Sequence, residues 1–83
     1  MSNNPSICIP RCESPHQKNL YYIFSKFGHI KNIQIYNKKV IINYKYWFMN
    51  DATTYNIINR LNTEKCVNIV YEFPWFWRCF KNA

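Results

Sequence analysis

The sequence predicts an α+β fold with the element order βαββαβ, in which a four-stranded antiparallel sheet carries both helices on one face. Two observations predict it. Apolar residues at helical spacing between Leu20 and Phe27 give way, after Gly28, to an alternation with a period of two. That alternation then continues in the same phase on both sides of a short polar turn at residues 37 and 38, as in a hairpin.

The first strand and the start of the first helix have local signals. Residues 6–9 form a short apolar run that Pro10 closes. Ser14 is predicted as the helix N-cap, with Pro15 in the first turn and Gln17 completing a capping box. The first helix is therefore expected to start at this signal.

Gly28 marks the change from helix to strand. One face of the predicted helix carries Leu20, Ile23, Phe24 and Phe27, so the helix is expected to reach about residue 27. Gly28 follows where a left-handed C-cap is easiest for a residue without a side chain. We therefore expect Gly28 to end the helix with a positive φ.

A two-residue turn at Asn37 and Lys38 fixes the register of the predicted hairpin, since Asn tolerates a positive φ. This turn pairs Ile35 with Val40 and residue 33 with residue 42, so that four apolar side chains share one face. The other face then carries Gln34, Tyr36, Lys39, Ile41 and Asn43.

The second half of the chain repeats the helix and strand signals. Asn50 or Asp51 is predicted to cap a second helix, and a last strand is expected at residues 67–71. The inner face of that helix is predicted to contain Ala52, Tyr55, Ile58 and Leu61. The completed βαββαβ order predicts a ferredoxin-like fold. Its core is predicted to contain Ile9, Leu20, Phe24, Phe27, Ile33, Ile35, Val40, Ile42, Ile58 and Leu61.

The chain of 83 residues has room for one small domain, predicted at 1–83, with a core at 6–72 and an aromatic tail at 73–83. Five of the eight residues from Phe73 to Phe80 are aromatic. Pro74 argues against simple continuation of a central strand. Since an exposed Trp is uncommon in a monomer, at least one of Trp75 and Trp77 is expected to pack back onto the domain.

The charge of the chain favours a polyanionic partner. The net charge is +7, and only four residues are acidic. Such an excess is typical of nucleic-acid-binding proteins. The alternative is a solvated surface or a general lysine bias, because Asn, Ile, Lys and Tyr are as abundant as AT-rich coding would produce.

Enzymatic and metal chemistry find no support in the residue spacing. The four cysteines form no Cys-x-x-Cys pair, so no zinc site is predicted. The four acids form no spaced carboxylate pair, and a single Gly cannot make a phosphate loop. We therefore expect no enzyme, no catalytic residue, no metal and no cofactor. No apolar run approaches the roughly 20 residues needed to cross a membrane, and residues 1–5 do not resemble a signal peptide, so the chain is expected not to be secreted.

The stretch Phe-Ser-Lys-Phe-Gly-x-Ile-x-x-Ile-x-Ile at residues 24–35 closely resembles the first helix and second strand of an RNA recognition motif (RRM) domain. This resemblance implies the RRM mode of binding, in which aromatic side chains of two central strands stack on the bases of single-stranded RNA. The three stacking positions of that family fall here on Cys8, Lys39 and Ile41.

A second resemblance spans nearly the whole chain. Ile-Pro-Arg at residues 9–11, Tyr-Lys-Tyr-Trp-Phe at 44–48 and Pro-Trp-Phe-Trp-Arg at 74–78 are similar to small RRM-like proteins of large (giant) DNA viruses. The resemblance implies a viral protein located in the host cytoplasm or nucleus, or packaged in the virion.

The sequence thus predicts a small RRM-like module that binds nucleic acid, single-stranded RNA rather than DNA, with weak sequence preference. The predicted nucleic-acid-binding residues are Arg11, Tyr36, Lys38, Lys39, Ile41, Asn43, Lys45, Trp75, Trp77 and Arg78. The alternative is a viral structural or protein–protein interaction module that reuses the fold and docks through the tail at Phe73–Phe80.

Overall fold

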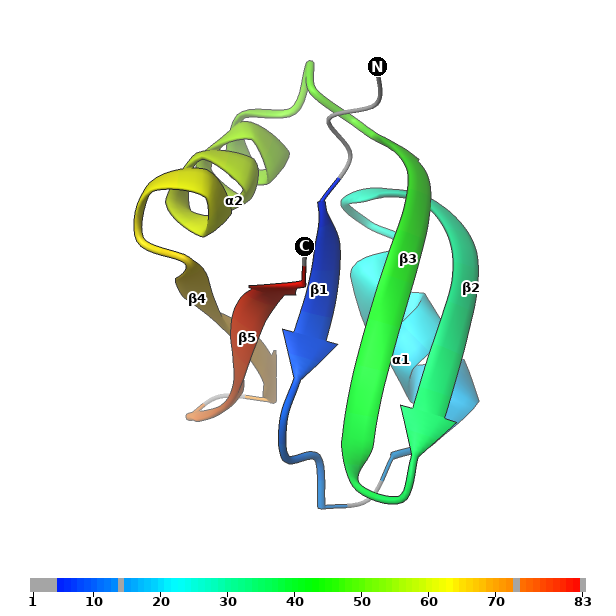
Figure 1. The fold of residues 1–83 in the computed structure, drawn as a ribbon. Helices are drawn as coiled ribbons and strands as arrows, with labels where there is room; N and C mark the ends of the chain where they lie inside the picture. Colours follow the sequence, from blue (N-terminus) through cyan, green and yellow to red (C-terminus); the bar gives the residue numbers. More distant parts are fainter. Residues whose placement is uncertain (1–4, 14, 73, 83) are drawn as a thin grey trace.

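The computed structural model describes residues 5–13, 15–72 and 74–82. These residues form an α+β fold with two helices and one five-stranded antiparallel sheet in the order β2-β3-β1-β5-β4 (Figure 1). The elements are β1 (Ser6–Ile9), α1 (Gln17–Phe24), β2 (Gly28–Tyr36), β3 (Lys39–Trp47), α2 (Ala52–Thr63), β4 (Cys66–Glu72) and β5 (Trp75–Asn82).

The predicted four-stranded sheet is wrong by one strand. The segment predicted as an aromatic tail forms β5, which lies between β1 and β4 and pairs with both, through Cys8–Phe80 and Ile69–Trp77 among others. The strand predicted to be last, β4, forms an edge of the sheet and pairs with β5. Pro74 lies in the turn between the two strands, where the ladder needs no N–H donor, so it permits a hairpin instead of ending the sheet.

The predicted hairpin between β2 and β3 is confirmed. Ile35 pairs with Val40, and Asn37 takes the expected left-handed conformation with a φ of 60°. Further along, the register shifts twice, and Lys31 and Lys45 are the extra residues at these shifts. Because each bulge changes the parity of its strand, simple alternation stops predicting side-chain direction beyond this point.

Gly28 does not cap α1. The helix ends at Phe24, and Gly28 begins β2 without a positive φ. The structural reason for a glycine is space: a Cβ there would lie 2.5 Å from the backbone oxygen of Tyr46 and 2.9 Å from Cα of Trp47. At the other end of the helix, the N-cap position is His16, whose side chain makes no capping bond, and the predicted cap Ser14 lies outside the described residues.

The cap of α2 is confirmed, but its buried face differs from the prediction. Asp51 accepts hydrogen bonds from the backbone N–H groups of Thr53 at 2.8 Å and Thr54 at 3.3 Å. The predicted inner residues Ala52 and Tyr55 are exposed. The buried residues of α2 are Thr54, Ile57, Ile58 and Leu61, which is the spacing of one helix face.

Both helices and the inward side chains of the strands form a single core. Eight of the ten predicted core residues are buried, and Phe27 and Ile35 are partly buried against the cluster. Two buried hydrogen bonds tie its edges: Tyr44 Oη donates to the oxygen of Phe24 at 2.7 Å, and Trp47 Nε1 donates to the oxygen of Pro5 at 3.1 Å. Side chains that alternate with the core residues of the strands define what we call the outer face of the sheet.

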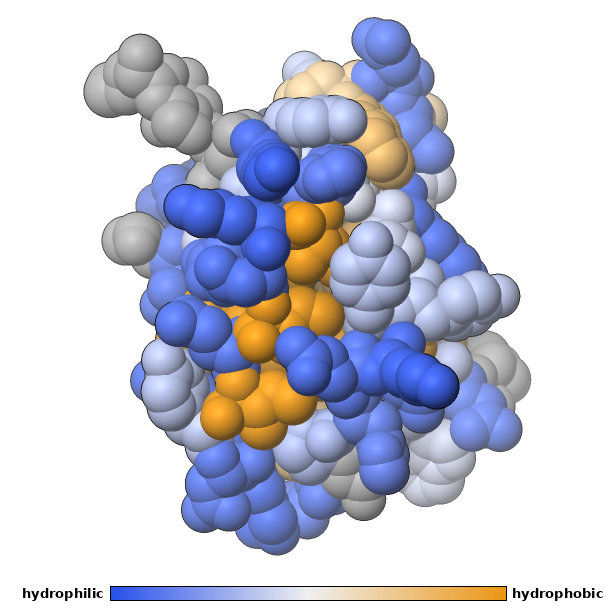
Figure 2. Space-filling view, turned by 90° about the vertical axis from the view of Figure 1, so that its right-hand side faces the viewer, coloured by the Kyte–Doolittle hydropathy of each residue, from blue (hydrophilic) through white to orange (hydrophobic). Residues whose placement is uncertain are grey.

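On one side of the molecule a strip of hydrophobic surface remains visible. In Figure 2, hydrophilic side chains surround a central hydrophobic strip. The edge strand β2 contributes Ile30 and Ile33 to the core, each with 9% of its surface exposed. These two residues of β2 therefore lie on the helix side of the sheet.

Candidate nucleic-acid interface

A row of paired residues crosses all five strands in the middle of the outer face. Gln34 pairs with Ile41, Ile41 with Cys8, Cys8 with Phe80, and Phe80 with Cys66. All except Gln34 are half-buried, so the centre of the face is a shallow apolar platform. Phe80 supplies an aromatic ring next to Cys8, on the side away from Ile41, where the RRM resemblance led us to expect none.

Phe80 was missed at the sequence level because the tail was predicted to lie outside the sheet. In β5, inward and outward residues do not differ in polarity: Trp77 and Cys79 point inward, and Phe76 and Phe80 point outward. Alternation of apolar and polar residues is therefore absent from this strand. Its direction follows only from its pairing with β1.

A hydrogen-bonded cluster of polar side chains borders the platform. Ser6 Oγ donates to Asn43 Oδ1 at 2.5 Å. Asn43 Nδ2 donates to Asn32 Oδ1 at 2.7 Å and to Gln34 Oε1 at 3.3 Å. This cluster links β1, β3 and β2, and it places the predicted site residue Asn43 on the outer face.

Aromatic rings also lie where β2 begins and β3 ends. His29 pairs with Tyr46, and their rings stack with centroids 5.4 Å apart and planes 20° apart. This pair alternates with Gly28 and the buried Trp47, so both rings lie on the outer face. Phe48 meets Tyr46 edge-on at 6.1 Å. Counting along the strand could not reveal this group, because the two bulges intervene.

The strands contain several basic residues but very few acidic ones. Lys39 pairs with Tyr36, and Arg78 pairs with Asn68, all on the outer face. Lys45 is exposed at a bulge of β3. Across the five strands the only carboxylate is Glu72, at the end of β4. The predicted residues Tyr36, Lys39 and Arg78 are thus placed together on an outer face whose own strand positions carry no acid.

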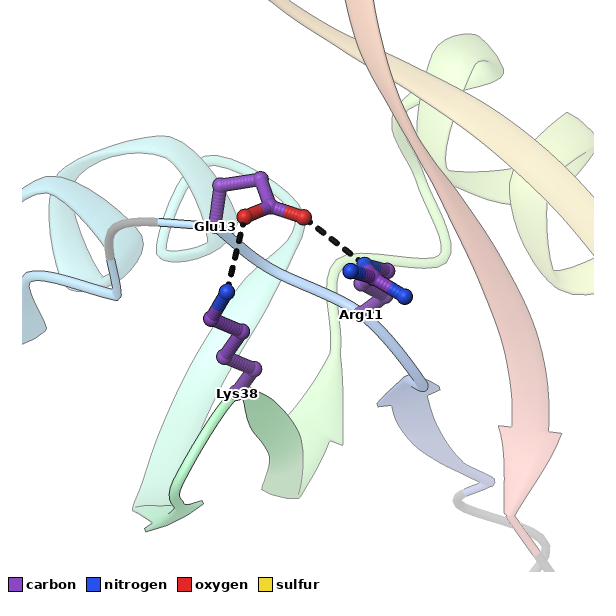
Figure 3. A network of polar contacts seen from close by, with 3 residues as sticks. All are labelled: Arg11, Glu13 and Lys38. Atoms are coloured by element: carbon purple, nitrogen blue, oxygen red, sulfur yellow. Dashed lines mark hydrogen bonds and ion pairs between the residues drawn. The ribbon is translucent and has the colours of Figure 1, made fainter.

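Arg11 and Lys38 are placed differently, in loops beyond the end of the sheet. Figure 3 shows Glu13 between them, with Nε of Arg11 at 2.7 Å and Nζ of Lys38 at 3.0 Å from its two carboxylate oxygens. Hydrogen bonds from Arg11 and Lys38 lower the pKa of Glu13, and the hydrogen bond to Glu13 raises the pKa of Arg11. These two cations already share one anion, so they contribute less to the field of the outer face.

Trp77 lies on the helix side and is not available to the outer face. Its ring stacks on Phe24, with centroids 5.6 Å apart and planes 19° apart, and on Tyr71, at 4.3 Å and 18°. The expectation that at least one of the two tail tryptophans packs on the domain is confirmed. Trp75, at the start of β5, keeps 64% of its surface exposed.

Other chemistry finds little support among the residues that the structure describes. Within residues 5–13, 15–72 and 74–82, no group of three or more His, Cys, Asp or Glu side chains is close enough to hold a metal ion. Neither helix described is long and apolar enough to span a membrane. Burial raises the pKa of the Cys79 thiol to about 12, so this cysteine is not an activated nucleophile.

Comparison with known proteins adds no relative to this description. No family model, curated protein or solved structure matches the chain.

Proposed function

We propose that the protein binds single-stranded nucleic acid, RNA in preference to DNA, across the outer face of its sheet. The observation that supports this proposal is the distribution of charge: Lys39 and Arg78 lie on the outer face, Lys45 is exposed at a bulge beside them, and no outer-face position of the five strands carries a carboxylate. A face with this imbalance attracts phosphates, and the attraction is sequence-independent. The half-buried platform in the middle of the face suits unstacked bases, which a duplex does not offer.

The outer face offers a group for each part of a nucleic-acid strand. Lys39 and Arg78 face phosphates, while the rings of Phe80 and Tyr36 are available for stacking. Stacking of a base on an aromatic ring is worth about 1–3 kcal/mol and tolerates any base. The hydroxyl of Ser6 lies beside the platform; it donates its hydrogen to Asn43 and keeps lone pairs that can accept from a ribose 2′-hydroxyl.

A salt titration tests the proposal. Fluorescence anisotropy of a short labelled RNA is measured from about 50 to 300 mM salt, with single-stranded DNA and duplex RNA as competitors. Engaging about two to four phosphates predicts a slope of roughly −1.4 to −2.8 in log K against log salt. Binding that is absent, that is insensitive to salt, or that is as tight for duplex as for single strands would refute the proposal.

Phe80→Leu gives a sharper version of the same test. Leucine keeps the apolar contact with Cys8 but removes the ring, so affinity for RNA is expected to fall about tenfold. Tyr55→Leu, at an exposed position of α2, is the matched control and should leave affinity unchanged.

A second candidate function is docking of a protein partner at the β4–β5 turn. Val70, Tyr71, Trp75 and Phe76 leave large apolar side chains exposed there, and Trp75 is the most exposed of them. Such a cluster is a frequent mark of an interaction site. On this alternative, Trp75→Ser abolishes co-purification of a partner while leaving the fold intact. If Trp75→Ser instead leaves all co-purifying proteins in place, docking at this turn is excluded.

A further inference from the structure

The hydrogen bonds of the amide cluster determine which groups remain for a ligand. Asn43 is fully used: its oxygen accepts from Ser6, and its nitrogen donates to the oxygens of Asn32 and Gln34. An amide nitrogen has two hydrogens and its oxygen only accepts, so with the nitrogen of Asn43 turned toward β2, Asn32 and Gln34 must face it with their oxygens. Asn32 and Gln34 direct their oxygens toward Asn43, and their NH2 groups therefore point away from it.

These two NH2 groups are the accessible part of the cluster. Asn32 and Gln34 are exposed, whereas Asn43 is half-buried beneath them. Neither NH2 group donates to an atom of the described part of the chain. Gln34 is paired with Ile41, so its donor group lies at the end of the apolar platform, where the edge of a stacked base would lie.

An amide whose oxygen already accepts a hydrogen bond recognises bases differently from a free amide. A free Asn or Gln side chain typically binds adenine with both of its groups, because the oxygen accepts from N6 and the nitrogen donates to N7. Here the oxygens of Asn32 and Gln34 are occupied by Asn43, so that two-pronged contact is blocked. What remains is a pair of donors, which is complementary to carbonyl oxygens and opposed to exocyclic amino groups.

We propose that this cluster gives the interface a preference for keto bases, uracil and guanine, over amino bases, cytosine and adenine. This inference rests on the proposed function, since it concerns the base that lies at the end of the platform. Uracil offers O4 where cytosine offers an amino group. Cytosine would therefore place a donor against the donors of the protein, although both bases are pyrimidines of the same size.

Two RNAs of equal length and charge test the preference. Oligouridine is expected to bind about fivefold more tightly than oligocytidine, the ratio that one gained hydrogen bond gives. The ratio of the two affinities is the quantity to follow, because general electrostatic attraction affects both strands equally. A ratio of one, or tighter binding of oligocytidine, would overturn the inference.

Asn43→Asp is the decisive variant. The carboxylate is nearly isosteric with the amide but can only accept, so Asn32 and Gln34 must turn their NH2 groups toward it and expose their oxygens. The preference should then reverse, with oligocytidine bound more tightly. Asn56→Asp, exposed on α2, adds the same charge and should lower both affinities alike while preserving the original ratio.

Two further measurements keep the outcomes distinct. Should Asn43→Asp fail to fold, Gln34→Glu on the exposed strand surface replaces a donor by an acceptor and should shift the ratio toward oligocytidine, since a carboxylate accepts from N4 of cytosine. An unchanged ratio in a folded Asn43→Asp or Gln34→Glu variant would exclude the amide cluster as the source of preference. Absence of salt-dependent binding to either RNA would instead refute the proposed function itself.

Discussion

Trp77 shows how one residue connects the last strand to the helix side of the sheet. Its ring is stacked between Phe24 of α1 and Tyr71 of β4, so three elements meet at one aromatic group. Offset or stacked rings add to the free energy of simple burial. The neighbouring Trp75 has two-thirds of its surface in solvent and makes no comparable contact among the ring pairs of the described residues.

The two tryptophans are therefore expected to differ sharply in their effect on stability. Trp77→Ala should lower the free energy of unfolding by about 2–4 kcal/mol, through lost burial and the cavity that it leaves. Trp75→Ala serves as the control and should change it by less than about 1 kcal/mol. Urea unfolding followed by far-UV circular dichroism measures both. Equal effects would mean that Trp77 is not packed as described.

Two buried groups predict how stability depends on pH. Burial raises the pKa of the Tyr44 hydroxyl, and it raises that of the Cys79 thiol from its ordinary value of 9.0 to about 12. A group whose folded pKa is raised stabilises the fold fully below its unfolded pKa, and this contribution is lost as pH rises toward the folded value. For Cys79 the loss therefore falls between pH 9 and about 12.

Between pH 8 and about pH 10.5, Cys79 alone should remove about 1–2 kcal/mol from the free energy of unfolding. Cys79→Ala should lower stability at pH 8 but weaken its decline above pH 9, and urea unfolding at both values measures this. Cys66→Ala, at the half-buried end of β4, is the control and should keep the decline. A decline of the same size in Cys79→Ala would assign it to other groups.

At the scale of elements, structure that depends on neighbouring residues could be predicted from the sequence, and structure that depends on distant strand pairing could not. The β2–β3 hairpin could be derived from parity because its turn and both of its strands are adjacent in the chain. The predicted buried face of α2 was rotated about the helix axis relative to the observed one, because the buried Thr54 is polar and gives no hydrophobic signal. The position of β5 depends on the pairing of Phe80 with Cys8, more than seventy residues away in sequence. The place of Phe80 in the apolar platform could therefore not be predicted from the sequence.

The turn between β2 and β3 is expected to set the register of this hairpin. Asn37 has a φ of 60°, a conformation that glycine adopts without penalty and that a β-branched residue resists. Asn37→Gly should be neutral or slightly stabilising, whereas Asn37→Val should cost about 1–2 kcal/mol. Thermal unfolding compares the two variants. If valine is tolerated as well as glycine, the turn does not have this conformation in solution.

At the scale of the whole molecule, the four acidic residues are kept away from the outer-face positions of the sheet. Asp51 caps α2, Glu64 ends it, Glu13 joins two loop cations, and Glu72 ends β4. The acids are thus held at the ends of elements, and the outer face keeps its basic residues. The net charge of +7 could be read from composition, but this segregation follows only from the fold.

Charge reversal at matched positions tests whether segregation matters or net charge alone. Lys39→Glu combined with Arg78→Glu changes two outer-face residues, and Lys18→Glu combined with Lys26→Glu changes two exposed residues in or just beyond α1. Both pairs remove the same net charge. The outer-face pair should weaken RNA binding strongly and reduce the salt slope by about 1.4, as expected for two lost phosphate contacts.

The α1 pair should leave that slope nearly unchanged and lower affinity only modestly, because its charges act from the helix side. Lys26 lies 4.8 Å above the Tyr22 ring, and its variant therefore needs a check of folding before affinities are compared. Anisotropy titrations at several salt concentrations measure both quantities. If the two pairs weaken binding equally, RNA is attracted to the net charge of the protein, and the outer face is not a defined site.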